Sequence, residues 1–265
     1  MSPDAEKAAP LMARRLEDLC RAAYKVTLDL PLPEDDHFAF MASCFLAKQL
    51  EHATAVLRLG EHPDGWLVAR CMLEGMWQLK WAALERDTRP ERWRRFAHVH
   101  DWRLLRERDE QGVFTDESTR ERLHASIKEH GAQFLSKRSR DEIAEGKEPP
   151  AEPYEKTWYG VQIRQIAEKV GDLDLYLTAY NDFSERQHWD VAGVARGIRV
   201  EGTSITYNAS SPSALVIATA IAFQCLAMSA LLIDSSFDRG FREVLLEIIQ
   251  AHIQDGHSYG VKVAT

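Results

Sequence analysis

Residues Ser213 to Ile233 read SALVIATAIAFQCLAMSALLI, and this run decides the fold. None of its 21 residues is charged, so the run is long enough to cross a lipid bilayer. Gln224 would then lie near the membrane centre, and no cluster of Lys or Arg closely flanks the run to orient it. An uncharged helix is equally typical of the centre of a soluble bundle. We therefore interpret the run as a central bundle helix, and a membrane-attached sensor that uses residues 213–233 is the alternative.

Most of the remaining chain carries apolar residues at the spacing of an amphipathic α-helix. Proline and glycine divide this pattern into segments, and Thr88-x-x-Glu91 and Ser118-x-x-Glu121 match the capping box that begins many helices. The segments predict helices over Pro10–Leu30, Glu34–Leu59, Trp66–Glu85, Thr88–Gln111, Ser118–Gly146, Trp158–Val170, Leu173–His188 and Arg239–Gln254.

Two stretches depart from the helical pattern. Residues 147–157 contain three prolines and predict a long internal loop. Near residues 197–208, apolar residues at alternating positions flank the turn Glu201–Ser204, which predicts a small β-hairpin. The expected fold is therefore all-α: an up-and-down multi-helix bundle with one small β-hairpin insertion. Because neither side of the loop has its own set of core helices, we expect a single domain over residues 1–265, with an N-terminal helix within residues 1–33.

The composition excludes several classes of protein. The chain has 265 residues, of which 45% are hydrophobic and 9% aromatic, so it can bury a sizeable core and is not a long disordered chain. The net charge of −8 disfavours a protein that coats nucleic acid through a broad cationic surface. Many of its arginines nevertheless fall within residues 89–108. We interpret them as a solvated helix face that is paired with the neighbouring acidic residues Glu91, Asp101, Glu107 and Asp109.

The cysteines and the N-terminus bear on the cellular compartment. The four cysteines are far apart in apolar helical segments, and none belongs to a Cys-x-x-Cys motif. They predict small buried hydrophobes in a reducing compartment rather than disulfides or a zinc site. The first residues, Met1 to Asp4, lack the basic segment and apolar core of a signal peptide. We expect a cytoplasmic protein without stable membrane association.

The helix predicted over Trp66–Glu85 is apolar on nearly every side, yet it contains a charged pair. Arg70 and Glu74 are four residues apart and share one face with several tryptophans, among them Trp77. Burying an ion costs several kcal/mol unless it is paired and hydrogen-bonded. The pair is therefore a candidate functional group, or a structural salt bridge between two helices.

A second polar group lies before the hairpin. Tyr180, Ser184 and His188 are spaced four residues apart, so we expect them on one helical face. A hydroxyl one turn from an imidazole can orient the ring or fix its tautomer. His188 falls at the predicted end of its helix, where a cleft could reach it; the alternative is a histidine at the edge of the core.

Spaced motifs carry a resemblance to a known family. The segment FLAKQLE at Phe45–Glu51 precedes an Arg-x-x-x-Glu motif within Leu67–Gly75, and a Ser-x-x-x-His motif follows within Tyr180–His188. In this order they resemble an uncharacterised bacterial family, domain of unknown function 5677 (DUF5677), over roughly Leu46–Leu232. The resemblance implies a fold and a candidate site, and it implies no reaction.

A wider analogy is with the HEPN group of helical ribonucleases. In that group an Arg-x4–6-His motif supplies a phosphate-binding cation and an acid–base imidazole. This chain has such spacings only within its arginine-rich stretch, where they are expected by chance. If the analogy holds, Arg70 and His188 from different helices are the better candidates.

The first functional hypothesis is a HEPN-like phosphodiesterase acting on RNA or a nucleotide. His188 would be the general acid or base, Arg70 would stabilise the phosphate, and Glu74 would orient either of them. The substrate-binding residues would be Ser184, Tyr180 and Trp77.

The alternative hypothesis is a non-catalytic helical module that binds a protein or a ligand. In it the same residues form a structural polar network. We expect no cofactor and no metal, because the chain has no Walker loop, GxGxxG, GxSxG or HExxH motif. The candidate partners are RNA, a nucleotide or a small ligand, and a second copy of the chain in a homodimer.

Overall fold

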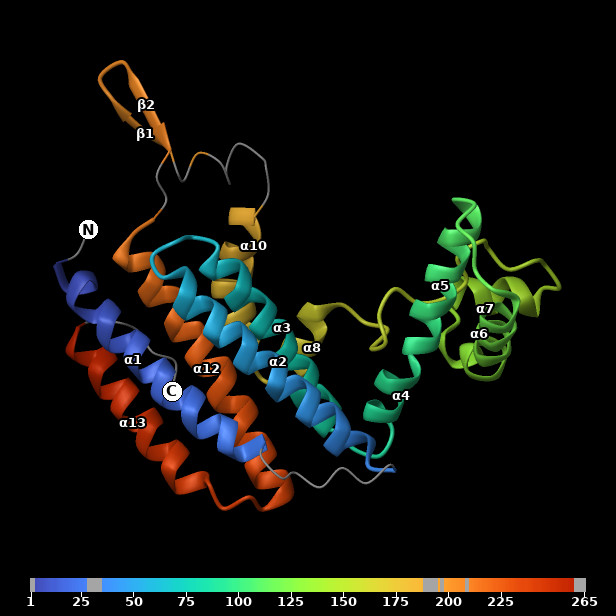
Figure 1. The fold of residues 1–265 in the computed structure, drawn as a ribbon, viewed down its shortest axis with the longest axis horizontal. Helices are drawn as coiled ribbons and strands as arrows, with labels where there is room; N and C mark the ends of the chain where they lie inside the picture. Colours follow the sequence, from blue (N-terminus) through green and yellow to red (C-terminus); the bar gives the residue numbers. More distant parts are fainter. Residues whose placement is uncertain (1–2, 28–34, 188–194, 196–197, 208–209, 260–265) are drawn as a thin grey trace. The chain divides into compact units, whose positions relative to one another are not determined.

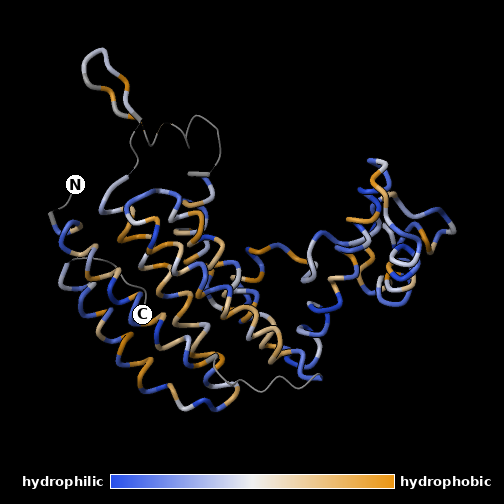
Figure 2. Tube along the Cα trace, viewed as in Figure 1, coloured by the Kyte–Doolittle hydropathy of each residue, from blue (hydrophilic) through white to orange (hydrophobic). Residues whose placement is uncertain are grey.

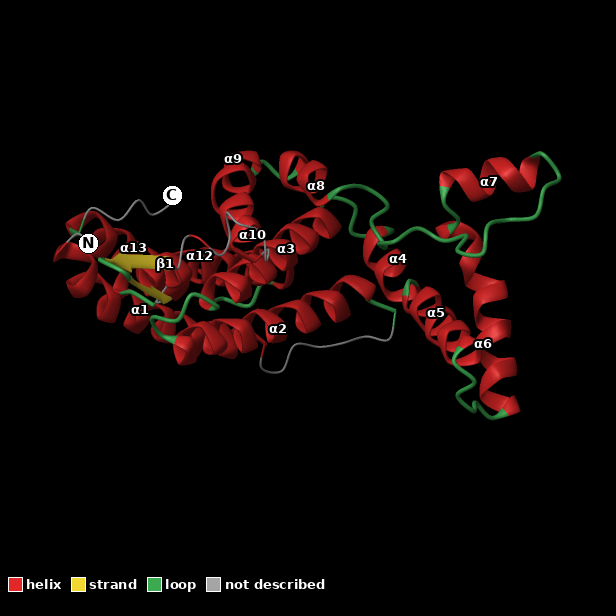
Figure 3. Cartoon of the chain, turned by 90° about the horizontal axis from the view of Figure 1, so that it is seen from above, coloured by secondary structure: helices red, strands yellow, loops and turns green. Residues whose placement is uncertain are grey.

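The computed structural model describes residues 3–27, 35–187, 195, 198–207 and 210–259. Regular structure in this part of the chain is helical apart from one hairpin (Figure 3), which confirms the predicted all-α class. The chain divides into two compact units. The first comprises Met1–Leu84 and Ile163–Thr265, and the second comprises Glu85–Gln162. This division rests on contacts within the folded chain and does not show whether either unit folds alone. The expectation of a single domain over residues 1–265 therefore stays a prediction.

The first unit is a bundle built around the uncharged run (Figure 1). This run forms α12, Pro212–Phe237, which packs against four other long helices. These are α1 (Pro3–Thr27), α2 (His37–Leu59), α3 (Gly65–Ala83) and α13 (Arg242–Ser258). Figure 2 shows hydrophobic residues along the length of α12. The predicted central helix is therefore confirmed.

By length and composition α12 is also able to span a membrane. Its most apolar window has a mean hydropathy of 2.2, and 61% of that window is buried inside the bundle. A buried core helix passes the same test of length and composition, so this finding is weak evidence for a membrane span. The expectation of no stable membrane association stays a prediction.

Polar contacts fix the ends of α12 and its approach to α3. The Ser211 side chain accepts a hydrogen bond from the Ala214 N–H at 3.1 Å and so caps the first turn. The indole N–H of Trp66 donates to the Ala214 carbonyl at 3.0 Å. A Cβ at Gly65 would lie 3.2 Å from the Cβ of Ala218, so glycine permits the two helices to approach closely here. At its other end, Asp234 accepts from the Phe241 N–H at 2.7 Å and ties α12 to α13.

Four shorter segments follow the second unit along the chain, and all of them except Leu173–Leu175 pack against α3. They are α8 (Ile163–Lys169), α9 (Leu173–Leu175), a π-helical segment (Tyr176–Tyr180) and α10 (Asn181–Gln187). The predicted helix over Trp158–Val170 is therefore shorter than expected. The helix predicted from Leu173 exists, but π-helical turns interrupt it. Lys80 of α3 and Asp172 form an ion pair of 2.6 Å that anchors this region.

The second unit contains short helices where the sequence predicted two long ones. They are α4 (Arg89–Arg95), α5 (Ala97–Glu110), α6 (Glu117–His130), a 3-10 turn (Gly131–Phe134) and α7 (Lys137–Ala144). Both predicted capping boxes are wrong. Thr88 makes no capping bond, and Asp116, not Ser118, caps α6 by accepting from the Thr119 N–H at 2.9 Å.

The structure confirms the predicted loop 147–157, and Arg103 and Arg106 hold it, whereas Arg92 bonds beside it. Arg92 donates to the carbonyls of Trp158 at 2.7 Å and Gln133 at 2.8 Å. Arg103 donates to Glu152 and to the Glu155 carbonyl, each at 2.8 Å, and Arg106 donates to the Ala151 carbonyl. The interpretation as a solvated face paired within the stretch is thus only partly right. The Arg95–Glu91 pair has the expected form, at 2.6 Å.

The hairpin prediction is confirmed. Strand β1 (Ile198–Glu201) pairs antiparallel with β2 (Ser204–Tyr207), and Val200 lies opposite Ile205. Gly202 has a φ of 62° in the turn, a conformation that glycine adopts without strain.

Three expectations about the bundle need correction. Helix α1 begins at Pro3, so Pro10 lies inside the helix instead of at its start. Helix α13 begins and ends a few residues later than predicted, at Arg242 and Ser258. The cysteines are free, but only Cys225 is buried, whereas Cys44 and Cys71 are exposed. Their apolar neighbours in sequence face the core while these two point outward.

Candidate functional site

Three of the predicted residues form one hydrogen-bonded network, which we call the Arg–Glu–Tyr network: Arg70, Glu74 and Tyr180. The Arg70 guanidinium donates to the Tyr180 hydroxyl oxygen at 2.8 Å, and that hydroxyl donates to Glu74 Oε1 at 2.7 Å. The guanidinium also lies 3.0 Å from Glu74 Oε1. Each member therefore contacts both others, while the Nε of Arg70 is buried without a hydrogen-bond partner among the described residues.

The local structure explains this meeting. Arg70 and Glu74 are one turn apart on α3, so their side chains lie side by side. Tyr180 comes from the end of the π-helical segment, which packs on α3. An inserted π-turn changes which side chains face a neighbouring helix. The Arg70 guanidinium also lies 4.8 Å from the centre of the Tyr180 ring, so the ring face and the hydroxyl both favour the cation.

Aromatic rings form the inner wall of the network. Trp77 is fully buried, and its ring centre lies 5.5 Å from that of Tyr180 and 6.0 Å from that of Tyr176. Tyr176 in turn stacks on Tyr180 with ring centres 5.0 Å apart. Trp77 therefore packs against the Tyr180 and Tyr176 rings of this region. Its role toward a substrate stays a prediction.

The surroundings keep Tyr180 and Arg70 protonated at neutral pH. Burial is the largest cause that raises the pKa of Tyr180, to about 12, and the hydrogen bond to Glu74 adds to it. Burial alone would lower the pKa of Arg70, but the hydrogen bond to Tyr180 and the charge of Glu74 raise it overall. The network thus combines a cation, a neutral hydroxyl and the carboxyl group of Glu74.

The network lies at the edge of the bundle. Tyr180 is 7% exposed, whereas the side chains of Arg70 and Glu74 are 24% and 30% exposed. The charged groups therefore keep some contact with water, and the phenol ring beneath them does not.

The remaining predicted site residues do not join the network in the described part of the chain. Ser184 lies on α10, half-buried, and makes no hydrogen bond with Arg70, Glu74 or Tyr180. His188 lies outside the described residues, so its predicted catalytic role stays a prediction. Among the residues that the structure describes, no group of three or more His, Cys, Asp or Glu side chains is placed to hold a metal ion.

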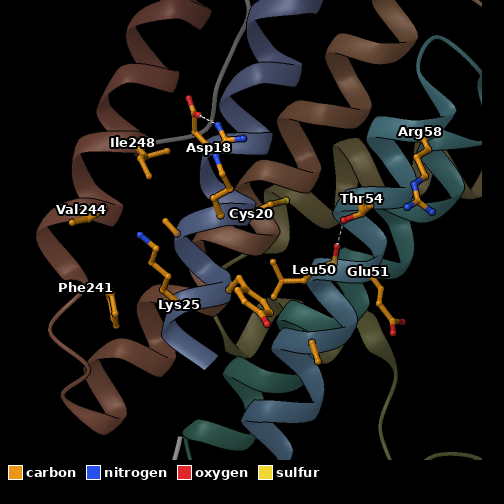
Figure 4. A pocket seen from close by; sticks show the side chains of 14 residues that line it. Asp18, Cys20, Lys25, Leu50, Glu51, Thr54, Arg58, Phe241, Val244 and Ile248 are labelled. Carbon is orange, nitrogen blue, oxygen red and sulfur yellow. Dashed lines mark hydrogen bonds and ion pairs between the residues drawn. The ribbon is translucent and has the colours of Figure 1, made fainter. Parts of the chain in front are cut away.

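A second feature, which sequence reasoning missed, is a surface groove on the first unit. Helices α1, α2 and α13 line it, with a volume of about 1320 Å³ (Figure 4). Its apolar wall includes Tyr24, Leu50, Phe241, Val244 and Ile248. None of the residues of the Arg–Glu–Tyr network lines this groove.

Charged side chains border the groove, and some of them are already paired. Asp18 forms ion pairs with Arg15 at 3.7 Å and with Arg21. Glu51 pairs with Lys48 at 2.9 Å. Two further lining cations, Lys25 and Arg58, have no ion pair with any described residue. Burial raises the pKa of Cys20, another lining residue, to about 11, so its thiol is not a reactive thiolate at neutral pH.

One signal in the sequence could have indicated the groove. Phe241, Val244 and Ile248 follow the spacing of one helical face, and so do Leu50, Thr54 and Arg58 on α2. These faces could be recognised as apolar or mixed, but which of them the bundle leaves uncovered depends on how the helices pack.

Comparisons with known proteins give a family and no function. A family model matches residues 39–204, and it describes a family of unknown function (DUF5677). The matched range contains the whole Arg–Glu–Tyr network, but it excludes α1 and α13, two of the three helices that line the groove. No curated protein and no solved structure matches the chain.

Proposed function

The chain belongs to the DUF5677 family, whose function is unknown, and from that premise we propose that it is a non-catalytic helical binding module in which the Arg–Glu–Tyr network is structural. The observation that carries this proposal is the mutual bonding of the network: Arg70 and Glu74 pair with each other, and both bond to the Tyr180 hydroxyl.

The Arg–Glu–Tyr network is poorly suited to bind and cleave a phosphodiester. A phosphate that approached Arg70 would have to compete with Glu74, whose oxygen already lies 3.0 Å from the guanidinium. Tyr180 keeps its proton at neutral pH, because burial and Glu74 raise its pKa to about 12. Arg70 also keeps its proton. Neither of these two residues can therefore act as the general base that the reaction needs.

The same network is well suited to hold the π-helical segment on α3. Hydrogen bonds that involve a charged group contribute roughly 1.5–3 kcal/mol each when they are well made. Arg70 and Glu74 are partly exposed, so we expect the lower part of this range.

Replacing Glu74 tests the structural role. Glu74→Ala should lower the free energy of unfolding by about 1–3 kcal/mol in urea titrations, because it leaves Arg70 and Tyr180 without their shared acceptor. The matched control is Glu51→Ala on α2, which removes an exposed carboxylate paired only with a surface lysine and should change stability by less than about 0.5 kcal/mol. Equal stability of the two variants would contradict a structural network.

A phosphodiesterase with a HEPN-like site is the second candidate, and the partial exposure of Arg70 and Glu74 is the observation in its favour. It predicts that the purified chain cleaves single-stranded RNA or a nucleotide diester, and that His188→Ala abolishes cleavage without changing the melting temperature. We propose that the chain is inert in this assay. Cleavage that depends on His188 would replace the binding proposal with the catalytic one.

We further propose a cytoplasmic location without stable membrane association. This rests on the burial of 61% of the most apolar window of α12. Fractionation of cells that express the full chain should recover it without detergent, whereas recovery only in detergent would favour the membrane-attached sensor.

A further inference from the structure

We propose that the groove between α1, α2 and α13 is the docking site for an amphipathic helix of a partner protein, with an apolar stripe and acidic residues beside that stripe. This inference names the partner class for the binding function proposed above and rests on it. Four observations carry it: the spacing of the lining residues, their exposure, the size of the groove and its charge.

The lining residues come from one face of each helix. Phe241, the N-cap residue of α13, and Val244 and Ile248 on that helix follow the i, i+3, i+7 spacing. On α2, Leu50, Thr54 and Arg58 are spaced four apart. Helical faces that meet in this way form the kind of groove into which a further helix packs by its own apolar stripe.

The face of α1 in the groove is left uncovered within the described part of the chain. Helices α2 and α13 both pack against α1 but hardly contact each other. Tyr24 on α1 is 58% exposed and Val244 on α13 is 47% exposed. Large apolar side chains that lie together and remain this exposed are typical of interaction surfaces.

The size of the groove fits a helix better than a small molecule. A helix of three turns is about 16 Å long and about 10 Å across, so it occupies roughly 1300 Å³. The groove measures about 1320 Å³. Sites for small ligands usually measure about 300–1000 Å³, so an acyl chain or a nucleotide would leave much of this space unfilled.

The charge of the groove favours acidic flanks on the incoming helix. Asp18 and Glu51 already have cationic partners, whereas Lys25 and Arg58 pair with no described residue. Figure 4 shows Lys25 and Arg58 well separated within the groove. Carboxylates beside the apolar stripe could reach both of them. The net charge of −8 opposes an acidic partner only at long range, because salt screens charges beyond about 8–10 Å.

Two synthetic helices serve as the probes. Each has about 14 residues, a hydrocarbon cross-link on its solvent face to hold the helix, and the same stripe of leucines. One carries glutamates beside the stripe, and the other carries lysines at the same positions. Fluorescence anisotropy with the full chain should show that the glutamate peptide binds about tenfold more tightly than the lysine peptide.

Two sets of variants locate the binding. Val244→Asp should weaken binding of the glutamate peptide about tenfold or more, because it places a carboxylate against the leucine stripe. The matched control is Leu246→Asp, since Leu246 lies on the same helix, is 44% exposed and does not line the groove. The control should bind within about twofold of the unmodified chain. Reversing both free cations, Lys25→Glu with Arg58→Glu, should reverse the preference between the two peptides.

Several results would overturn the proposal. They are equal binding of both peptides, equal binding by Val244→Asp and Leu246→Asp, or a preference that the charge reversal leaves unchanged. A dimer in sedimentation that only Val244→Asp dissociates would assign the groove to a second copy. Binding of palmitate, but of neither peptide, would assign it to a small apolar ligand. RNA cleavage that depends on His188 would contradict the proposed non-catalytic function. The peptide-binding measurements would still show separately whether the groove binds a helix.

Discussion

Tyr180 joins two segments that are far apart in sequence, since its hydroxyl both accepts from Arg70 and donates to Glu74. Tyr180→Phe keeps the ring stack on Tyr176 and removes only these two hydrogen bonds. We expect the free energy of unfolding to fall by about 1–2 kcal/mol in urea titrations. Tyr176→Phe is the matched control, because the Tyr176 hydroxyl makes no hydrogen bond with a described residue. A control variant that is destabilised as much as Tyr180→Phe would show that the hydroxyl of Tyr180 adds nothing.

His252 makes stability depend on pH. Its side chain is fully buried, stacks on Phe223 with ring centres 3.7 Å apart, and has no hydrogen-bond partner among the described residues. Burial is the main cause that lowers its pKa from 6.5 to about 4. Between these values the unfolded chain binds more protons, so the contribution of His252 is complete above pH 6.5 and is lost as the pH falls toward 4.

The loss that His252 causes should amount to about 3 kcal/mol over this pH window. Urea titrations of the full chain at several pH values should show it as a fall in unfolding free energy. His252→Leu should flatten that fall, whereas His257→Leu, on an exposed position of the same helix, should leave it unchanged. If both variants titrate like the unmodified chain, the buried imidazole is not the group responsible.

The candidate site was predictable from sequence only in part, and the reason lies in how its individual residues are positioned. The spacing of Arg70 and Glu74 places both on one face of any helix, so their pairing follows from local geometry. The closing of the network by Tyr180 depends on the π-helical segment, which no periodic pattern in the sequence indicates. The grouping of Tyr180 with Ser184 and His188 stays a prediction, because His188 lies outside the described residues.

Among the secondary-structure elements, the arginine-rich helices and the loop 147–157 depend on each other. Arg103 on α5 donates to Glu152 and to two backbone carbonyls near the end of that loop. Arg103→Ala should therefore release the loop and raise the rate of proteolytic cleavage within residues 147–157 about tenfold, since local opening exposes the backbone. Arg108→Ala removes an exposed arginine of the same helix and should leave cleavage unchanged. Equal rates of cleavage in both variants would show that Arg103 does not hold the loop.

The errors in helix boundaries also have physical causes. The predicted long helix breaks at Phe96, whose ring packs edge-on against Phe134 in the second unit, with centres 5.1 Å apart. The 3-10 turn at Gly131–Phe134 brings that ring into place. Such breaks satisfy tertiary packing, and local propensity does not reveal them. The loop and the hairpin were predictable because proline and glycine determine backbone geometry locally.

At the level of the whole molecule, the uncharged run of α12 was sufficient to predict an all-α bundle with this helix at its centre. A helix without a polar face needs cover on most of its surface, and α1, α2, α3 and α13 bury most of it, although Ile217 and Met228 stay 42% and 39% exposed. The groove could not be predicted in the same way. It exists because α2 and α13 diverge across α1, which is a property of their packing and not of any one sequence segment.

The central claim is that the Arg–Glu–Tyr network acts as one structural unit, and a double-mutant cycle on Glu74→Ala and Tyr180→Phe tests it most directly. Unfolding free energies of the unmodified chain, both single variants and the double variant give the coupling between the two side chains. We predict a coupling of about 1 kcal/mol, because either substitution alone already breaks the hydrogen bond between them. Single variants as stable as the unmodified chain, with effects that add within about 0.3 kcal/mol, would contradict the claim.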